Sequence, residues 1–252
     1  MDEPTVKLTI TPLKPAGEAS KCCILIVALT SPSDIPSEAA ILAAGESLLK
    51  STSTWKPGKT YYKTVKTYSR GKELGDGAPW HCRVSEHPPT EATFDQMWAK
   101  LGTNKAENEK EYISAINKVT RVKDISPTQS IWTLHYKFPP PVQPRVFTVL
   151  QIVHLTETSP RAGVVVSIPI DLSSPEDADL AKLEEKGVKG RYVSVEQVAE
   201  LENGNTEWRM ATSSTAGGLI PSFLTESTMN STIAEDVPHF MKWLHSLPSE
   251  SK

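Results

Sequence analysis

Arg83, Ser85 and His87 stand at every second position of a segment that alternates polar and apolar residues, the pattern of a β-strand. Their side chains therefore share one face and present a cation, a hydroxyl and a titratable imidazole, which together can hold a polar head group. Trp80 and Val84 lie on the opposite face. Such a polar row ordinarily faces water, but it points into an interior if the tryptophan face packs against outer helices.

A second group of candidates follows the proline-rich residues 139–144. Arg145 opens a strand there, with Phe147 and Gln151 on the same face. An arginine at the start of an apolar row is usually a rim residue. The alternative is a buried guanidinium, which needs an anionic partner, and Glu196 is then the candidate carboxylate.

The third group lies in the last strand before the C-terminal helix. Met210, Thr212 and Ser214 share one face, and the helix expected above them has Ser227 and Asn230 at its middle. Buried hydroxyl groups must find hydrogen-bond partners, so this mixture of side chains is unsuited to a dry core. The pattern therefore favours a pocket that holds a ligand or water.

The C-terminal residues predict one long amphipathic helix of about twenty-five residues that ends near Leu247. Its inward stripe is apolar at both ends but small or polar in the middle. A helix of this kind either approaches a sheet closely or leaves a hollow beneath it. The stripe consists of Ile220, Phe223, Ser227, Asn230, Ala234, Val237, Met241 and Leu244.

Composition and charge narrow the class of protein. The chain has 252 residues, 38% hydrophobic composition and a net charge of −3, which is typical of a globular protein with a sizeable core. We see no Lys/Arg-rich cluster or interleaved basic and aromatic stripe, and therefore expect no nucleic-acid partner. The N-terminus is acidic, and the longest apolar run, Cys22 to Leu29, is too short to span a bilayer. The three cysteines predict no disulfide framework, so we expect a cytoplasmic protein.

Other site chemistries find little support in the sequence. His81 and His87 lack a third ligand at metal spacing, so we expect no metal site. Neither a Gly-rich phosphate loop nor a Gly-x-Ser-x-Gly nucleophile motif occurs, and we expect no cofactor. The charged residues 107–111 are interpreted as a solvated helix face.

Periodicity and turn residues predict an α+β protein. A helix is expected from Pro36 to Lys50, capped by Ser33 or Asp34, and two further helices from about Glu91 to Leu101 and Lys105 to Lys118. Short turns between neighbouring strands favour an antiparallel sheet, whose concave face must be covered by the long helix. Strands are expected at Thr60 to Ser69, Pro79 to Glu86, Thr120 to Asp124, Gln129 to Phe138, Arg145 to Leu155, Gly163 to Ile170, Gly190 to Val195 and Thr206 to Ser214.

This order of elements resembles the START-like helix-grip family of lipid-binding domains, and most closely a fungal group of START-like proteins of unknown function. The resemblance implies a curved antiparallel sheet around a long C-terminal helix, with an internal apolar cavity, over residues 35–248. It leaves residues 1–34 as a partly ordered N-terminal extension and 249–252 as a tail. The segments that carry the resemblance are residues 80–87, 111–113, 132–136, 144–147, 208–212, 217–221 and 236–243.

The resemblance implies a tunnel that holds a sterol, a phospholipid or a similar apolar molecule, with transient contact to a membrane surface for exchange. The main alternative is an enzyme, such as a cyclase or isomerase, that uses the same cavity with His87, Tyr136 or Glu196 as acid or base. A third reading is an interaction module with a filled core. We expect ligand binding rather than catalysis, at residues Arg83, Ser85, His87, Tyr136, Arg145, Phe147, Glu196, Met210, Thr212, Ser214, Phe223, Ser227 and Asn230.

Overall fold

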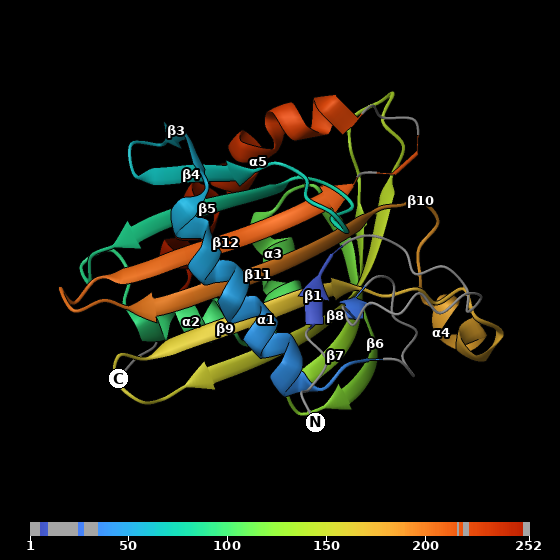
Figure 1. Ribbon diagram of the computed structural model, residues 1–252, viewed down its shortest axis with the longest axis horizontal. Helices are drawn as coiled ribbons and strands as arrows, with labels where there is room; N and C mark the ends of the chain where they lie inside the picture. Colours follow the sequence, from blue (N-terminus) through green and yellow to red (C-terminus); the bar gives the residue numbers. More distant parts are fainter. Residues whose placement is uncertain (1–5, 10–24, 28–34, 216, 219–221, 249–252) are drawn as a thin grey trace.

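The computed structural model describes residues 6–9, 25–27, 35–215, 217–218 and 222–248. Its main sheet has ten strands, with α1 across one face and α2, α3 and α5 on the other (Figure 1), and β1 and β2 form a separate two-stranded parallel sheet. Apart from β10, which pairs in parallel with β8, the strands of the main sheet run antiparallel to their neighbours in the order β3-β4-β5-β12-β11-β9-β8-β7-β6. A curved antiparallel sheet around a long C-terminal helix is the arrangement expected of the helix-grip fold.

The strands are β1 (Val6–Leu8), β2 (Leu25–Val27), β3 (Lys56–Tyr61), β4 (Val65–Arg70), β5 (Trp80–His87), β6 (Ile116–Ser126), β7 (Gln129–Tyr136), β8 (Arg145–Thr156), β9 (Ala162–Pro169), β10 (Val188–Lys189), β11 (Arg191–Glu200) and β12 (Thr206–Thr215). The helices are α1 (Glu38–Ser51), α2 (Phe94–Leu101), α3 (Lys105–Tyr112), α4 (Ala178–Ala181) and α5 (Ser222–Ser246), with short 3-10 turns at Thr52–Thr54 and Pro175–Asp177. Among the described helices, none is long and apolar enough to cross a membrane.

Several expected boundaries are wrong. The strand expected from Gly190 to Val195 extends to Glu200, the one from Thr120 to Asp124 begins at Ile116, and the helix expected from Glu91 begins at Phe94. The helix expected from Pro36 starts at Glu38, because Ser37 caps it by accepting a hydrogen bond from the Ala40 amide at 3.3 Å; Ser33 and Asp34 lie outside the described residues. The single strand expected from Thr60 to Ser69 is two strands, joined by a turn at residues 62–64.

The helix expected from Lys105 to Lys118 ends at Tyr112, and Ile116 already pairs with Tyr136 in the sheet. The physical reason is tertiary pairing, since the Ile, Val and Thr residues of this segment fit the pleated surface beside β7 as well as a helix face.

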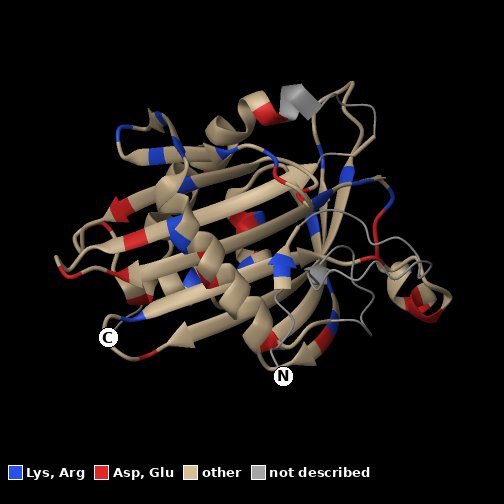
Figure 2. Ribbon diagram, viewed as in Figure 1, with Lys and Arg blue, Asp and Glu red and all other residues tan. Residues whose placement is uncertain are grey.

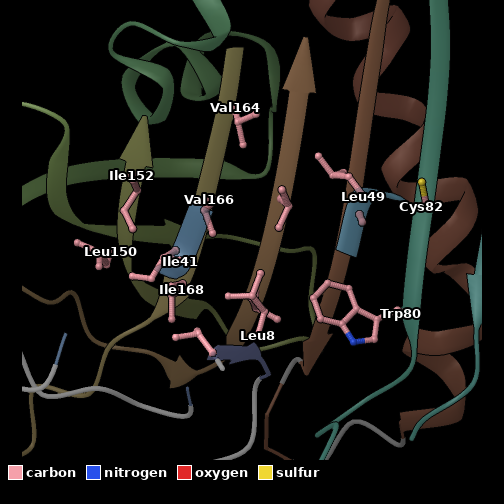
Figure 3. Close-up of a cluster of buried hydrophobic side chains, with 14 of the residues drawn as sticks. Leu8, Ile41, Leu49, Trp80, Cys82, Leu150, Ile152, Val164, Val166 and Ile168 are labelled. Atoms are coloured by element: carbon pink, nitrogen blue, oxygen red, sulfur yellow. The ribbon is translucent and has the colours of Figure 1, made fainter. Parts of the chain in front are cut away.

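The face of the sheet beneath α1 is an apolar core. Trp80, Cys82 and Val84 of β5 point into it and pack with Ile41 and Leu49 of α1 (Figure 3). The tryptophan face of β5 is thus covered by a helix, which is the condition under which Arg83, Ser85 and His87 point toward the opposite, interior face. That face is concave and is covered by α5.

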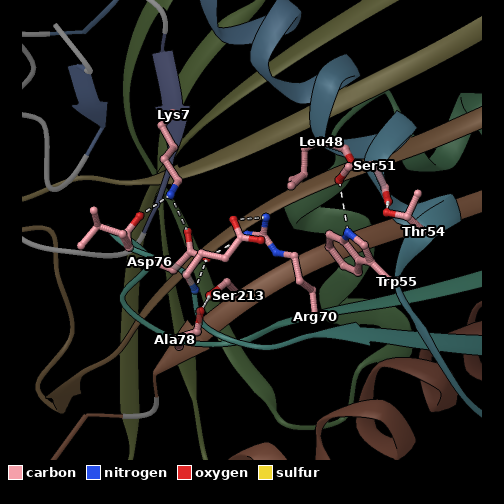
Figure 4. A network of polar contacts seen from close by, with 11 residues as sticks. Lys7, Leu48, Ser51, Thr54, Trp55, Arg70, Asp76, Ala78 and Ser213 are labelled. Carbon is pink, nitrogen blue, oxygen red and sulfur yellow. Dashed lines mark hydrogen bonds and ion pairs between the residues drawn. The ribbon is translucent and has the colours of Figure 1, made fainter.

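The N-terminal strand β1 is bound to this core through side chains and through a polar network. Val6 and Leu8 are 7% and 4% exposed and belong to the same apolar cluster as α1. Lys7 lies 3.3 Å from the buried carboxylate of Asp76, which also pairs with Arg70 at 2.8 Å (Figure 4). The network joins β1 to the turn between β4 and β5.

The C-terminal half of α5 covers a second apolar cluster. Val237, Phe240 and Met241 pack there against Trp208 of β12 and against Met97 of α2. The ring centroids of Phe240 and Trp208 are 4.9 Å apart. This end of the concave face is therefore filled by side chains. The hollow predicted beneath the helix could lie only under its N-terminal half.

Candidate ligand-binding site

A row of polar side chains crosses the concave face and begins at His81, under the N-terminal half of α5. The strand register places His81 of β5 opposite Thr212 of β12, then Ser194 of β11, Ser167 of β9 and Gln151 of β8. All five residues are less than 9% exposed. The Nε2 atoms of His81 and Gln151 are buried without a hydrogen-bond partner among the described residues. Polar groups left in this state are costly, so the row is suited to a ligand that supplies the missing contacts.

A cluster of buried charges forms the next row toward the filled end. Arg83, Met210 and Glu196 are cross-strand neighbours on β5, β12 and β11. Arg83 Nη2 lies 3.1 Å from Glu196 Oε1, and Lys105 of α3 forms an ion pair with the other oxygen of Glu196. Trp208 donates its indole N–H to Glu196 Oε1 at 2.6 Å. The carboxylate is thus held by two cations and one neutral donor.

This cluster has further capacity for a ligand. The guanidinium carbon of Arg83 lies 3.9 Å from the ring centroid of Trp208, a cation–π contact. The Nε and Nη1 atoms of Arg83 are buried without a hydrogen-bond partner among the described residues. Because Arg83 is 1% exposed, its remaining donors face the interior of the protein and not bulk water. They could bind an oxygen of a ligand.

The pKa values of the cluster follow from burial and from neighbouring charges. Burial alone would raise the pKa of Glu196, but Lys105 and Arg83 outweigh it and hold the pKa below its usual range. Burial raises the pKa of Asp236 on α5 to about 7, partly opposed by the charge of Arg83. Burial would lower the pKa of Lys105, yet Glu109 and Glu196 raise it well above its usual value. Glu196 therefore stays ionised, whereas Asp236 titrates near neutral pH.

Glu109 shows that the charged residues 107–111 are not uniformly solvated. Its side chain is 16% exposed and lies 2.6 Å from the ammonium of Lys105. The prediction of a solvated helix face is wrong for this residue, because the buried Lys105 requires anionic partners on both sides. Glu107, Lys110 and Glu111 are exposed as expected.

His87 belongs to a separate hydrogen-bonded chain on β5. Its Nε2 lies 2.9 Å from Ser85 Oγ, and its Nδ1 lies 2.9 Å from Glu91 Oε2. The sequence of hydroxyl, imidazole and carboxylate also occurs in serine hydrolases. Here, however, Ser85 is 1% exposed and its hydroxyl also contacts the Trp208 carbonyl at 3.5 Å, so it is packed in the protein and not presented to a substrate. The chain anchors β5 to the loop before α2.

Two contacts of described side chains join the N-terminal half of α5 to the concave face. Asn230 Oδ1 lies 2.8 Å from His81 Nδ1, and Ser214 Oγ lies 4.0 Å from the sulfur of Met229. Met210 and Ser214 remain half-buried on this face, in contrast to the fully covered Trp208. The small and polar centre of the helix thus lies above a face that is polar and partly open.

An aromatic wall borders the same face on β7, β8 and β11. The ring of Phe147 lies 5.3 Å from that of Tyr136 and 5.6 Å from that of Tyr192. Burial raises the pKa of Tyr136 well above its usual value, so its hydroxyl stays protonated. Arg145, at the end of this wall, is 4% exposed and donates to the carbonyl of Gln143. These side chains offer an apolar surface with polar tips.

The structure places the expected site residues on one face but not all in one contact network. Alternation and register put those of β5, β7, β8, β11 and β12 on the concave side. Asn230 faces them and Ser227 is exposed; the side chain of Phe223 lies outside the described residues. The expected pairing of Arg145 with Glu196 is wrong, because Glu196 binds Arg83 and Lys105 instead. Their roles in ligand binding stay predictions.

Five residues of this site were not predicted as ligand-binding. His81 and Gln151 were only placed on the right faces, whereas Lys105, Ser167 and Ser194 escaped the sequence reasoning. A signal for the serines was present, since each interrupts a Val-rich strand on the face that alternation assigns to the interior. Lys105 gave no such signal, because its burial depends on how α3 packs against β6 and α5 and on its ion pair with Glu196 of β11.

Surface grooves lie away from this face. One of about 440 Å³ runs between β1 and α1 and includes Leu8, Ala44 and Arg70. Another of about 730 Å³ lies between α2 and the end of α5 and includes Trp98, Leu244 and His245. Neither contains a residue of the polar row or of the charged cluster.

Comparison with solved structures places the fold. Human STARD10 superposes with a TM-score of 0.65 at 10% identity, over 85% of this chain and 82% of that one. Human StAR-related lipid transfer protein 5 gives 0.62 at 12% identity, over 83% and 98%. A fragment of the STAR-related lipid transfer protein from Xanthomonas axonopodis gives 0.60 at 16% identity, over 76% and 99%. At these identities the likeness shows that the fold is START-like.

Comparison with protein-family models assigns the chain to a family. No curated protein matches the chain. A family model described as "Protein of unknown function (DUF3074)" matches residues 80–244, from the start of β5 into the last turn of α5. Since this match spans well over half of the sequence, the chain belongs to the DUF3074 family, here seen with a START-like helix-grip fold.

Proposed function

We propose that the protein binds a hydrophobic small molecule, such as a sterol, a phospholipid or a related lipid, between the concave face and α5, and transfers it within the cell. The ligand-binding domain would comprise residues 35–248. Burial of the ligand's apolar part is worth about 25 cal/mol per Å² and supplies the driving force. The polar row and the charged cluster would select its head group.

The observation that carries the proposal is a set of buried polar atoms on the concave face without a partner among the described residues. They belong to His81 and Arg83 of β5 and to Gln151 of β8, on the same concave face. A protein interior normally satisfies such groups. A bound head group would do so here with acceptor oxygens for Arg83 and Gln151 and a hydroxyl donor for His81 Nε2, because His81 Nδ1 already donates to Asn230 Oδ1. Structural neighbours described as lipid transfer proteins support the same reading.

Exchange of a lipid with a membrane would require the N-terminal half of α5 to move away from the sheet. Among the described side chains, two contacts that hold it are the hydrogen bond of Asn230 with His81 and the contact of Met229 with Ser214. The C-terminal half, fixed by Val237, Phe240 and Met241, would stay in place. The helix would therefore act as a gate with its fixed end near α2.

A substitution that fills the proposed site with a bulky side chain tests the proposal. Ser214 faces α5, whereas the next residue, Thr215, points to the opposite face of the sheet. We expect the Ser214→Phe variant to lose binding of fluorescent sterol and phospholipid analogues by about tenfold or more, because the ring occupies the ligand's space. The Thr215→Phe control should bind as the wild type does. Equal binding by all three proteins would contradict the proposed location.

A further inference from the structure

The hairpin formed by β3 and β4 is a strongly basic part of a protein with net negative charge. Residues 47–72 contain no Asp or Glu. Lys56, Lys59, Lys63 and Lys66 are all exposed, and none of them forms an ion pair with the part of the chain that the structure describes. Figure 2 shows basic but no acidic residues on this hairpin. The lysines interleave with tyrosines, so the expectation that no basic and aromatic stripe exists is wrong here.

The turn of the hairpin holds two bulky residues in a backbone conformation that they rarely adopt. Tyr62 and Lys63 have φ angles of 48° and 68°, in the left-handed region. Asn and Gly are the residues that enter this region with little strain. Tyr62 nevertheless extends its side chain into solvent and is 53% exposed. Strain retained at an exposed tip indicates that these two side chains have a use outside the fold.

Protection of a sheet edge explains only part of this pattern. β3 is an edge strand, and Lys56, Pro57 and the register shift between Pro57 and Thr60 are devices that prevent edge-to-edge pairing. Tyr62 and Lys63 lie in the turn, beyond the last strand pair of Tyr61 with Val65. They offer no such protection, and an exposed tyrosine would favour association.

The chemistry of the hairpin fits the surface of an anionic bilayer. Lysines are attracted to acidic lipid head groups, and tyrosine side chains favour the boundary between head groups and acyl chains. A nucleic acid would instead call for a groove with several stacking rings along its path. The hairpin offers one exposed ring at a protruding tip.

The hairpin also lies beside the proposed gate. Both β3 and β4 contact α5, and a Cβ atom on Gly58 would come within 2.9 Å of Asn230 Nδ2. We propose that the β3–β4 hairpin docks the protein on membranes that contain acidic phospholipids, with Lys56, Lys59 and Lys63 as the electrostatic contacts and Tyr62 as the interfacial anchor. The proposal rests on the proposed function, since docking here brings the N-terminal half of α5 to the bilayer.

Vesicle co-sedimentation of the full chain tests the docking surface. The wild type should bind vesicles of phosphatidylcholine with phosphatidylserine more tightly than phosphatidylcholine alone, and salt should weaken the binding. Each lysine near such a surface contributes about fivefold in affinity, so the Lys56→Gln, Lys59→Gln, Lys63→Gln variant should bind on the order of a hundredfold more weakly. Lys66 is left intact because it lies near an acidic residue: its register partner on β5 is Val84, and Glu86 follows two residues later on the same face of that strand.

A charge-matched control separates the effect of the hairpin lysines on vesicle binding from the effect of the protein's net charge. Lys110, Lys123 and Lys137 are exposed and lie on or beside α3, β6 and β7, away from the hairpin. The variant with Gln at these three positions should bind as the wild type does. Equal loss in both triple variants, equal binding to both kinds of vesicle, or binding to a single-stranded oligonucleotide without binding to vesicles would overturn the proposal.

A turn variant separates docking from folding. Replacement of Tyr62→Asn together with Lys63→Gly should raise the melting temperature, because the turn strain is relieved, and should weaken vesicle binding at the same time. A higher melting temperature with unchanged vesicle binding would refute a role for the tip. Ligand content in native mass spectra should be the same in wild type and hairpin variants. Failure of docking is therefore distinguishable from failure of ligand binding.

Discussion

The guanidinium of Arg83 and the carboxylate of Glu196 meet at 3.1 Å across the intervening strand β12, with both residues almost completely buried. Lys105 reaches the same carboxylate from α3, so one anion on the sheet holds two cations. Burial of three charges is expensive unless each keeps its partners. This relationship sets the stability and the electrostatics of the concave face.

Removal of the Glu196 charge should strongly destabilise the protein. The Glu196→Gln variant leaves Arg83 and Lys105 buried beside a neutral side chain, and loss of one partner of a buried pair costs about 3–5 kcal/mol. Glu200, on the same strand, pairs with Arg161 at the surface, so Glu200→Gln should cost at most about 1 kcal/mol. Urea unfolding measures both. A similar small loss in both variants would show that the buried cluster is not held as described.

Asp236→Asn should stabilise the protein at neutral and alkaline pH. The pKa of Asp236 is raised to about 7 in the folded state, from about 3.9 in unfolded chains, chiefly by burial. Its contribution to stability is therefore full below the unfolded pKa and is lost as pH rises through the folded pKa. One pKa unit corresponds to about 1.4 kcal/mol, and we expect a gain of at least that size at pH 8. Equal unfolding midpoints at pH 8 would contradict the prediction.

Acid should weaken the protein through His81 and His87. Burial lowers the pKa of both imidazoles in the folded state, whereas it is about 6.5 in unfolded chains. Their contribution to stability is present above the unfolded pKa and is lost as pH falls through the folded values. Asp236 acts with the opposite sign over the same range, so the measurement belongs in the Asp236→Asn background.

In that background, urea midpoints should fall from pH 7 to pH 5. Substitution of both histidines by Gln should reduce the fall. A midpoint that is independent of pH in the parent variant would refute the assignment.

Asn230→Ala should loosen the N-terminal half of α5 alone. The hydrogen bond of Asn230 with His81 is worth about 1 kcal/mol, which corresponds to about fivefold faster amide exchange in that half. The C-terminal half, packed around Phe240, should exchange as before. Thr232→Ala, an exposed change in the same helix, is the matched control. Uniform acceleration along α5 would show that the helix opens as one unit and is not a gate with a fixed end.

Much of the fold could be predicted because local pattern and tertiary structure agree. The alternation in Trp80–His87 predicted β5 correctly, and the depleted centre of the C-terminal stripe predicted a helix that covers polar side chains. Prediction failed where tertiary pairing decides the conformation. Ile116 fits both a helix face and a strand, and only its pairing with Tyr136 resolves it.

The candidate site was predictable face by face but not contact by contact. Alternation assigned Thr212 to the interior, and Glu196 was expected there only as an anion for a buried arginine. The pattern could not show which cations lie beside that carboxylate. That information depends on strand order, which brings β5 beside β12, and on the packing of α3, which brings Lys105 to the sheet. Charge partners more than one strand apart leave no periodic signal in a single sequence.

Native mass spectrometry of the purified protein, followed by organic extraction, tests the central claim most directly. We predict one apolar molecule per chain, acquired during expression or on incubation with sterols and phospholipids. It should be absent from the Ser214→Phe variant and present in Thr215→Phe. A wild-type protein that stays empty after both treatments would contradict the claim that the concave face beneath α5 is a ligand-binding site.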